Sequence, residues 1–146
     1  MKKKLTCVLL IDDDEPTNYI NRLTIEEHGY AHQVQVASGA QEALDYLTNS
    51  GSFIGRGTNY PRPDLIFLDI NMPGMDGWEF LNRYKDLQNE QKGNIVMVML
   101  TTSLNPDDEF SARQNPEVAG FEHKPLTREM LDTLIARFFP DHLVEN

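Results

Sequence analysis

The sequence predicts an α/β fold in which helices cover both faces of a five-stranded parallel sheet. Short apolar runs alternate with amphipathic stretches, and this alternation is typical of successive βα units. Several of the apolar runs are continuous, which indicates strands that are buried on both faces. Five such pairs joined by right-handed crossovers leave few arrangements, and we expect a doubly wound sheet.

The first part of the chain contains two of these units. Residues 5–11 (LTCVLLI) form the first predicted strand, and Pro16 suits the start of a helix that ends at Gly29. Residues 33–37 (QVQVA) alternate in polarity, which favours a strand nearer the sheet edge, and residues 40–47 (AQEALDYL) predict a helix. The first helix carries a partly apolar stripe that consists of Ile20, Leu23 and Ile25.

The middle of the chain combines a long connection with two buried strands. Residues 49–63 are rich in Gly, Ser, Asn and Pro, so we expect a surface loop rather than a domain boundary. The apolar run 65–68 (LIFL) ends at Asp69 and predicts a central strand. Asp76 suits a helix N-terminus, and residues 95–100 (IVMVML) predict another fully buried strand.

The last part of the chain predicts two further helices around a short strand. Residues 106–114 predict a polar helix with acidic residues in its first turn. Residues 119–123 (AGFEH) predict a strand that is followed by Lys124. Thr127 caps the final helix, whose apolar residues recur at helical spacing: Met130, Leu131, Leu134, Ile135, Phe138 and Phe139. We expect one domain over residues 1–146, with a core of about 5–139 and a short tail.

The charge of the chain limits the kinds of partner that it can bind. A net charge of −10 repels nucleic-acid phosphate and anionic membranes, so we expect neither direct DNA binding nor membrane association.

The basic run at residues 1–4 and the apolar run after it are too short for a signal peptide, and we expect a cytoplasmic protein. The single cysteine, Cys7, excludes an intrachain disulfide and is expected to lie in a buried strand.

Polar residues follow four of the predicted strands, and parallel strands bring their carboxyl ends to the same edge of a sheet. Asp12 and Asp13 follow the first strand, and Asp69, Thr101 and Lys124 follow the third, fourth and fifth. Carboxylates gathered in this way repel one another and need a cation, and oxygen ligands favour Mg²⁺. A carboxylate between a divalent ion and an ammonium group can act as a nucleophile toward phosphorus. Asp14 more simply supports the start of the first helix.

Four segments of the chain resemble the receiver domains of bacterial response regulators, over about residues 5–139. The fold that this resemblance implies is a flavodoxin-like (βα)5 sheet with strand order 2-1-3-4-5. The matching segments are VLLIDDDEPTN (8–18), PDLIFLDINMPGMDGWEFL (63–81), VMLTTSLNPDD (98–108) and GFEHKPLT (120–127).

The resemblance assigns a role to each residue of this edge. It implies that Asp69 is the phosphoacceptor, that Asp13 binds Mg²⁺ directly and that Asp12 acts mainly through a metal-bound water. The backbone carbonyl of Asn71 would complete the protein ligands, and its side chain would face the attacking water. The remaining implied roles belong to Thr101 as the switch hydroxyl, Lys124 as the partner of the phosphoryl group, Pro125 after a cis bond, and Phe121 as an aromatic that swings inward.

The sequence departs from the family pattern in two places, the last strand and the loop of residues 49–63. Glu122 and His123 precede Lys124 where apolar residues are commoner, so we expect a more exposed or irregular last strand. The loop of residues 49–63 is longer than in a minimal receiver domain, and its role stays open. No DNA-binding or enzymatic sequence pattern follows Phe139, so we expect output through a protein contact or onward phosphoryl transfer.

The favoured function is a phosphoacceptor switch rather than a turnover enzyme. Its expected partners are a sensor histidine kinase or a histidine phosphotransfer protein, and a downstream protein that the sequence does not identify. A Mg²⁺-dependent aspartyl-phosphate phosphatase is the alternative, but such enzymes follow a D-x-D-x-T/V pattern and Pro16 occupies the fifth position after Asp12. A flavodoxin-like carrier fits less well, because the acidic loop after the first strand would repel a flavin phosphate.

Overall fold

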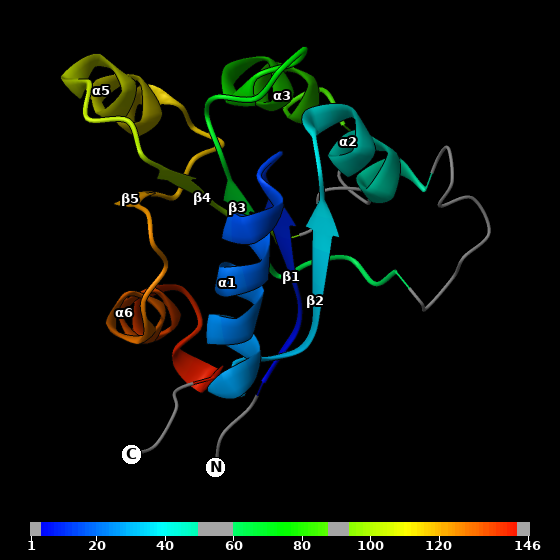
Figure 1. The fold of residues 1–146 in the computed structure, drawn as a ribbon, viewed down its shortest axis with the longest axis vertical. Coiled ribbons are helices and arrows are strands. Elements are labelled where there is room, and N and C mark those ends of the chain that lie inside the picture. Colours follow the sequence, from blue (N-terminus) through cyan, green and yellow to red (C-terminus); the bar gives the residue numbers. More distant parts are fainter. Residues whose placement is uncertain (1–3, 50–59, 88–93, 143–146) are drawn as a thin grey trace.

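The computed structural model describes residues 4–49, 60–87 and 94–142 (Figure 1). Strands and helices alternate along these residues, as the apolar pattern predicts. Their bounds are β1 Leu5–Ile11, α1 Glu15–Glu27, β2 Ala31–Ala37, α2 Ala40–Thr48, β3 Leu65–Leu68, α3 Gly77–Tyr84, β4 Val96–Thr101, α5 Pro106–Gln114, β5 Gly120–His123, α6 Arg128–Phe138 and a 3-10 helix at Pro140–His142.

The five strands form one parallel sheet in the order β2-β1-β3-β4-β5, which confirms the predicted fold and strand order. The chain moves outward from β1 to one edge at β2 and then crosses to β3 and the other edge. The strand order therefore reverses between β1 and β3, which is where ligands bind in sheets of this kind.

Two apolar layers hold helices against the two faces of the sheet. On one face, Ile25 of α1 and Leu131, Leu134 and Ile135 of α6 pack against alternate residues of the strands. On the other face, α2 and α3 pack together with Ala112 of α5. In Figure 1, α1 passes in front of the sheet beside β1. Because both faces are covered, the central strands are apolar on both sides, as their continuous runs predict.

Three helix N-termini lie where the sequence predicts them, and each has a side chain that satisfies a free backbone N–H group. Asp14 accepts a hydrogen bond from the backbone N–H of Thr17, Asp76 from Glu79, and Thr127 from Met130. The helix 106–114 has the predicted bounds, and the predicted strand bounds differ by one or two residues from β2, β4 and β5. The predicted loop of residues 49–63 lies mostly outside the described residues.

The predicted apolar stripe of α1 is wrong in part. Ile20 is 54% exposed, whereas Asn18 and Asn21 are buried beside Ile25 on the face that meets the sheet. Helical positions three and four residues apart share a face, and the sheet selects the face that contains the two asparagines. The burial of Asn18 is supported by the hydrogen bond that its Nδ2 donates to the backbone oxygen of Asp12 at 2.8 Å.

The last strand is the least buried of the five, which agrees with the expectation drawn from Glu122 and His123. Residues 120–122 are half-buried and His123 is exposed, whereas all four residues of β3 are buried. The structure places Cys7 in β1, fully buried as predicted. No helix in the described part of the chain is long and apolar enough to cross a lipid bilayer.

Candidate phosphoacceptor site

The register of the central strands places Asp12 and Asp69 side by side. Ile11 of β1 pairs with Leu68 of β3, so the residues that follow these two leave the sheet together. The backbone N–H of Asp69 donates to the carbonyl of Ile11 at 3.0 Å and continues the pairing by one residue. The first and third strands therefore deliver their terminal carboxylates to one point.

Three carboxylates form a group that fits a metal ion. Carboxylate oxygens of Asp12, Asp13 and Asp69 all lie within 4.8 Å of one another. Asp12 and Asp69 are 5% and 7% exposed, whereas Asp13 is exposed. A set of oxygen ligands that opens to solvent on one side suits Mg²⁺, which is hard and usually keeps several waters. The donor set therefore fits the metal that the sequence predicts.

Lys124 brings a positive charge to the same group from the end of β5. Its Nζ lies 2.5 Å from Asp12 Oδ2 and 3.4 Å from Asp69 Oδ1, and its side chain is 12% exposed. Burial by itself would lower the pKa of Lys124, but the hydrogen bond to Asp12 and the charges of both acids raise it. The ammonium group is therefore charged and bridges the two buried carboxylates. The peptide bond from Lys124 to Pro125 is cis, as predicted.

Asp69 is held in a setting that makes its charge costly. Burial, and then the negative charge of Asp12, raise the pKa of Asp69 above its ordinary value, while Lys124 acts in the opposite direction. A buried carboxylate with an incomplete counter-charge gains from a nearby cation. Perturbed carboxylates of this kind gather at functional sites, and this one lies at the reversal of strand order.

Short contacts hold the loops around these acids. The backbone N–H of Asp14 donates to Asp12 Oδ1 at 2.9 Å, while the Asp14 side chain caps α1. Gly77 begins α3, where a Cβ atom would lie only 2.6 Å from the backbone oxygen of Asp69. A side chain at this position would push α3 away from the acid, so glycine is required by the close approach.

Thr101 ends β4 fully buried, and its Oγ1 accepts a hydrogen bond from the backbone N–H of Ser103 at 3.1 Å. The loop after β4 is also joined to β5, because His123 Nε2 lies 3.1 Å from the carbonyl oxygen of Ser103. Phe121 is half-buried on β5 and its ring meets the ring of His123 edge to face. The predicted switch residues thus lie on two neighbouring strands.

Asn18 is a residue of this site that the sequence reasoning did not single out. It is 6% exposed, and its Nδ2 donates to the backbone carbonyl of Asp12 at 2.8 Å. The available signal was its spacing, because Asn18, Asn21 and Ile25 lie on one helical face. Asn71, which the sequence predicts as a backbone ligand, is exposed in the segment after β3.

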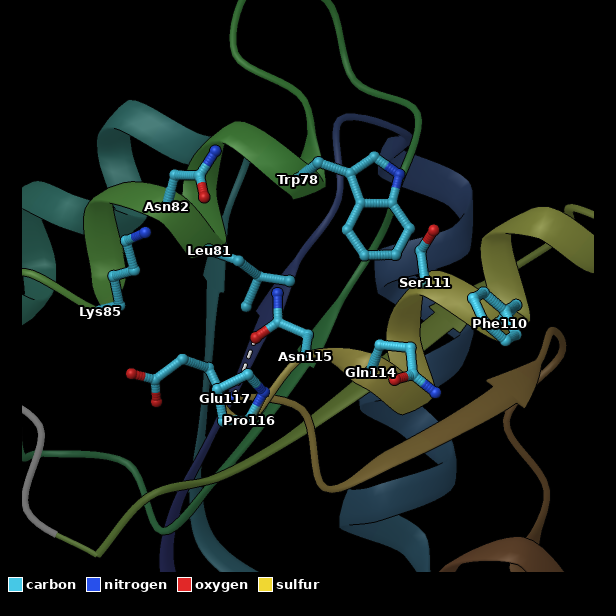
Figure 2. Close-up of a pocket in the computed structure, with 10 residues that line it drawn as sticks. All are labelled: Trp78, Leu81, Asn82, Lys85, Phe110, Ser111, Gln114, Asn115, Pro116 and Glu117. Carbon is cyan, nitrogen blue, oxygen red and sulfur yellow. Dashed lines mark hydrogen bonds between the residues drawn. The ribbon is translucent and has the colours of Figure 1, made fainter.

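A groove lies between α3 and α5, away from the carboxylates. This groove, of about 530 Å³, is lined by Trp78 and Leu81 from α3 and by Phe110 and Gln114 from α5 (Figure 2). None of Asp12, Asp69, Thr101 and Lys124 lines it. The size of a cavity therefore does not identify the chemical site in this molecule, whereas the converging charges do.

Comparison with known proteins identifies the class of protein that this fold and charge cluster define. The model of the response regulator receiver domain matches residues 8–136. The response regulator Rcp1 of Synechocystis sp. is 33% identical over 101 residues, which cover 69% of this chain and 65% of Rcp1. The chain therefore belongs to the response regulator receiver domain family and acts in two-component signalling.

Two further similarities extend over nearly the whole of both chains. Sporulation initiation phosphotransferase F of Bacillus subtilis is 27% identical over 135 residues, which cover 91% of this chain and 93% of that protein. A two-component response regulator from Cytophaga hutchinsonii has a solved structure with a TM-score of 0.81 and 29% identity, covering 94% of this chain and 99% of that chain.

Other relatives are longer than the match to this chain. The matched region spans 50% of the transcriptional regulatory protein CitT of Halalkalibacterium halodurans, in addition to the 65% of Rcp1. The match to this chain thus spans only part of the length of these two relatives.

Proposed function

We propose that this receiver domain accepts a phosphoryl group on Asp69 from a phosphohistidine of a sensor kinase or a histidine phosphotransfer protein. The observation that carries the proposal is the position of Asp69. Its carboxylate is buried, shares an ion-binding group with Asp12 and Asp13, and lies 3.4 Å from the Lys124 ammonium. Among the carboxylates of the group, it is the one that follows the central strand β3.

The residues that would hold Mg²⁺ are Asp12, Asp13, Asp69 and the backbone carbonyl of Asn71, with Asp13 as a direct ligand and Asp12 acting mainly through a bound water. The bound ion would supply positive charge to the oxygens of the transferred phosphoryl group. The carboxylate group in the structure supports this assignment, since it offers oxygen ligands within reach of one another.

The transfer itself exchanges one phosphorus bond for another. A carboxylate oxygen of Asp69 attacks phosphorus, the bond from phosphorus to the donor histidine nitrogen breaks, and the imidazole leaves with the electron pair. Lys124 balances charge on the phosphoryl oxygens. Hydrolysis reverses the modification when water attacks the aspartyl phosphate, and the Asn71 side chain would face that water.

The output of the phosphorylated state would come from Thr101 and Phe121. A phosphoryl group on Asp69 draws the Thr101 hydroxyl toward its oxygens, and Phe121 then turns inward on β5. The surface of α5, β5 and α6 shifts between two populated states and is read by a partner protein. The net charge of −10 supports a protein target rather than direct DNA binding.

Acetyl phosphate with Mg²⁺ provides the test. The unmodified protein should gain one phosphoryl group that hydroxylamine removes, and Asp69→Asn should gain none. Asp86→Asn, an exposed aspartate outside the site, is the matched control and should be labelled normally. Labelling of Asp69→Asn would refute the assignment, and steady release of phosphate from simple phosphomonoesters would favour a phosphatase instead.

A further inference from the structure

A small cavity lies between α1 and the sheet, and Asp12 and Asp69 are among the residues that line it. Its volume is about 10 Å³. Its polar lining consists of Asp12, Asn18, Asn21 and Asp69, and Phe67 and Leu100 provide apolar walls. All four polar residues are at least nine-tenths buried, with exposed fractions between 3% and 7%. The cavity is thus small, and half of the residues that line it are buried polar residues.

Asn18, which lines this cavity, has a buried oxygen atom without a hydrogen-bond partner in the described part of the chain. The Asn18 Nδ2 donates to the backbone oxygen of Asp12 at 2.8 Å, but Asn18 Oδ1 makes no hydrogen bond to any residue that the structure describes. A buried carbonyl-type oxygen that loses its hydrogen bonds to water is costly unless another donor replaces them. The orphaned atom therefore indicates a missing donor.

Rotating the amide by 180° does not remove the problem. The backbone oxygen of Asp12 can only accept a hydrogen bond, so the NH₂ group of Asn18 must face it. The amide oxygen then necessarily faces the other side, and the assignment of its two ends follows from the hydrogen-bond chemistry alone.

We propose that the cavity holds one buried water molecule. The volume is close to the minimum that a single water needs, and it leaves no space for a cation with its own hydration shell. Water has two donors, one for Asn18 Oδ1 and one for a carboxylate of Asp12 or Asp69, and it can accept from the Asn21 amide. Two to four polar partners are the normal environment of an internal water.

This water makes Asn18 and Asn21 positioning residues for the phosphoacceptor. It links Asn18 and Asn21 of α1 to the carboxylate group that contains Asp12 and Asp69. Hydrogen bonds from such a supporting layer fix the orientation of carboxylates at metal sites. The effect on phosphoryl transfer rests on the proposed function of Asp69, whereas the water site does not depend on it.

A crystal structure of the unmodified protein at a resolution that reveals ordered water, solved with and without Mg²⁺, tests the water site directly. One ordered water should lie about 3 Å from Asn18 Oδ1 in both structures. A dry cavity, a protein donor on Asn18 Oδ1, or a metal ion in its place would overturn the proposal.

Asn21→Leu tests the positioning role. Leucine keeps the hydrogen bond from Asn18 to Asp12 while it fills the cavity with apolar atoms, so the crystal structure of the variant should lack the water. Labelling by acetyl phosphate should slow on the order of tenfold, as for other supporting contacts at metal sites. Asn21→Ser leaves room for water and should recover most of the rate.

Asn82→Leu, at an exposed position of α3, is the matched control and should be labelled like the unmodified protein. A normal labelling rate in Asn21→Leu without the water would refute the positioning role. If the unmodified protein itself takes no label, the proposed function fails, and the crystal structures still decide whether the water is present.

Discussion

The carboxyl ends of β1 and β3 differ from that of β5 in how firmly they are buried. Asp12 and Asp69 leave strands whose apolar residues are all buried, and both acids are themselves below 10% exposed. On β5, residues 120–122 are half-buried and His123 is exposed. The two buried acids thus lie at the fully buried centre of the sheet, and the edge strand β5 is less buried.

The difference in burial between β1 and β3 on one side and β5 on the other indicates how a change of charge at the buried acids can alter the surface. Lys124 belongs to the less buried edge, yet its ammonium group lies between the two central acids. Any change of charge on Asp69 acts on Lys124 and therefore on β5, where fewer packed atoms resist movement. The predictions below test this contrast between centre and edge.

Lys124→Ala should have the largest effect, because it leaves two buried carboxylates without their ammonium partner. We expect a loss of about 3 kcal/mol in the free energy of unfolding without Mg²⁺. Urea denaturation measures it, and saturating Mg²⁺ should recover part of the loss. Arg113→Ala breaks an exposed pair with Glu109 and should cost no more than about 0.5 kcal/mol. If Lys124→Ala and Arg113→Ala lose the same free energy of unfolding, the buried ion pair is no more important for stability than the exposed one.

Asp13→Asn should remove about half or more of the stabilisation by Mg²⁺ while it leaves the fold intact, because Asp13 is an exposed member of the carboxylate group. In the unmodified protein, Mg²⁺ at a hundredfold excess over its Kd should add about 2.7 kcal/mol. The variant should bind roughly tenfold more weakly or worse. Thermal unfolding over a Mg²⁺ series measures both, and an unchanged Mg²⁺ response would contradict the ligand assignment.

Asp69→Asn should make the protein more stable at neutral pH in the absence of Mg²⁺. Burial and the charge of Asp12 raise the pKa of Asp69 in the folded state above its unfolded value of about 3.9. Ionised Asp69 therefore reduces stability above its folded pKa, and this penalty disappears as the pH falls through that value toward the unfolded one.

Thermal unfolding at several pH values measures this effect. The variant should be more stable than the unmodified protein at pH 7.5 and equally stable near pH 4. Lys124 keeps its 2.5 Å contact with Asp12 in the variant, so the comparison does not leave the ammonium unpaired. If the variant is less stable than the unmodified protein at neutral pH, the ionised carboxylate of Asp69 does not destabilise the fold as described here.

His123→Ala should have the smallest effect on stability. It removes a contact of 3.1 Å between Nε2 and the carbonyl oxygen of Ser103 at an exposed position, and we expect a change within about 0.5 kcal/mol. Urea denaturation is again the measurement. A loss above about 2 kcal/mol would mean that the β5 edge is packed as firmly as the centre.

Much of the fold could be predicted, because the local signals agree with the global arrangement. Continuous apolar runs marked β1, β3 and β4, and the caps Asp14, Asp76 and Thr127 marked three helix starts. The carboxylate group was also predictable, since parallel strands align the residues that follow them. The exposed Ile20 was not, because helical spacing alone did not show which face of α1 meets the sheet.

The sequence by itself determined the alternation of strands and helices and the set of acids that meet at one edge, and its resemblance to receiver domains implied the strand order. Only the tertiary structure decided that Asp12 is buried while Asp13 is exposed, and that Lys124 bridges Asp12 and Asp69. It alone showed that Asn18, whose buried oxygen is unpaired among the described residues, lines a cavity of about 10 Å³. The physical reason is that periodicity depends on neighbours along the chain, whereas burial and charge pairing depend on groups brought together from distant segments.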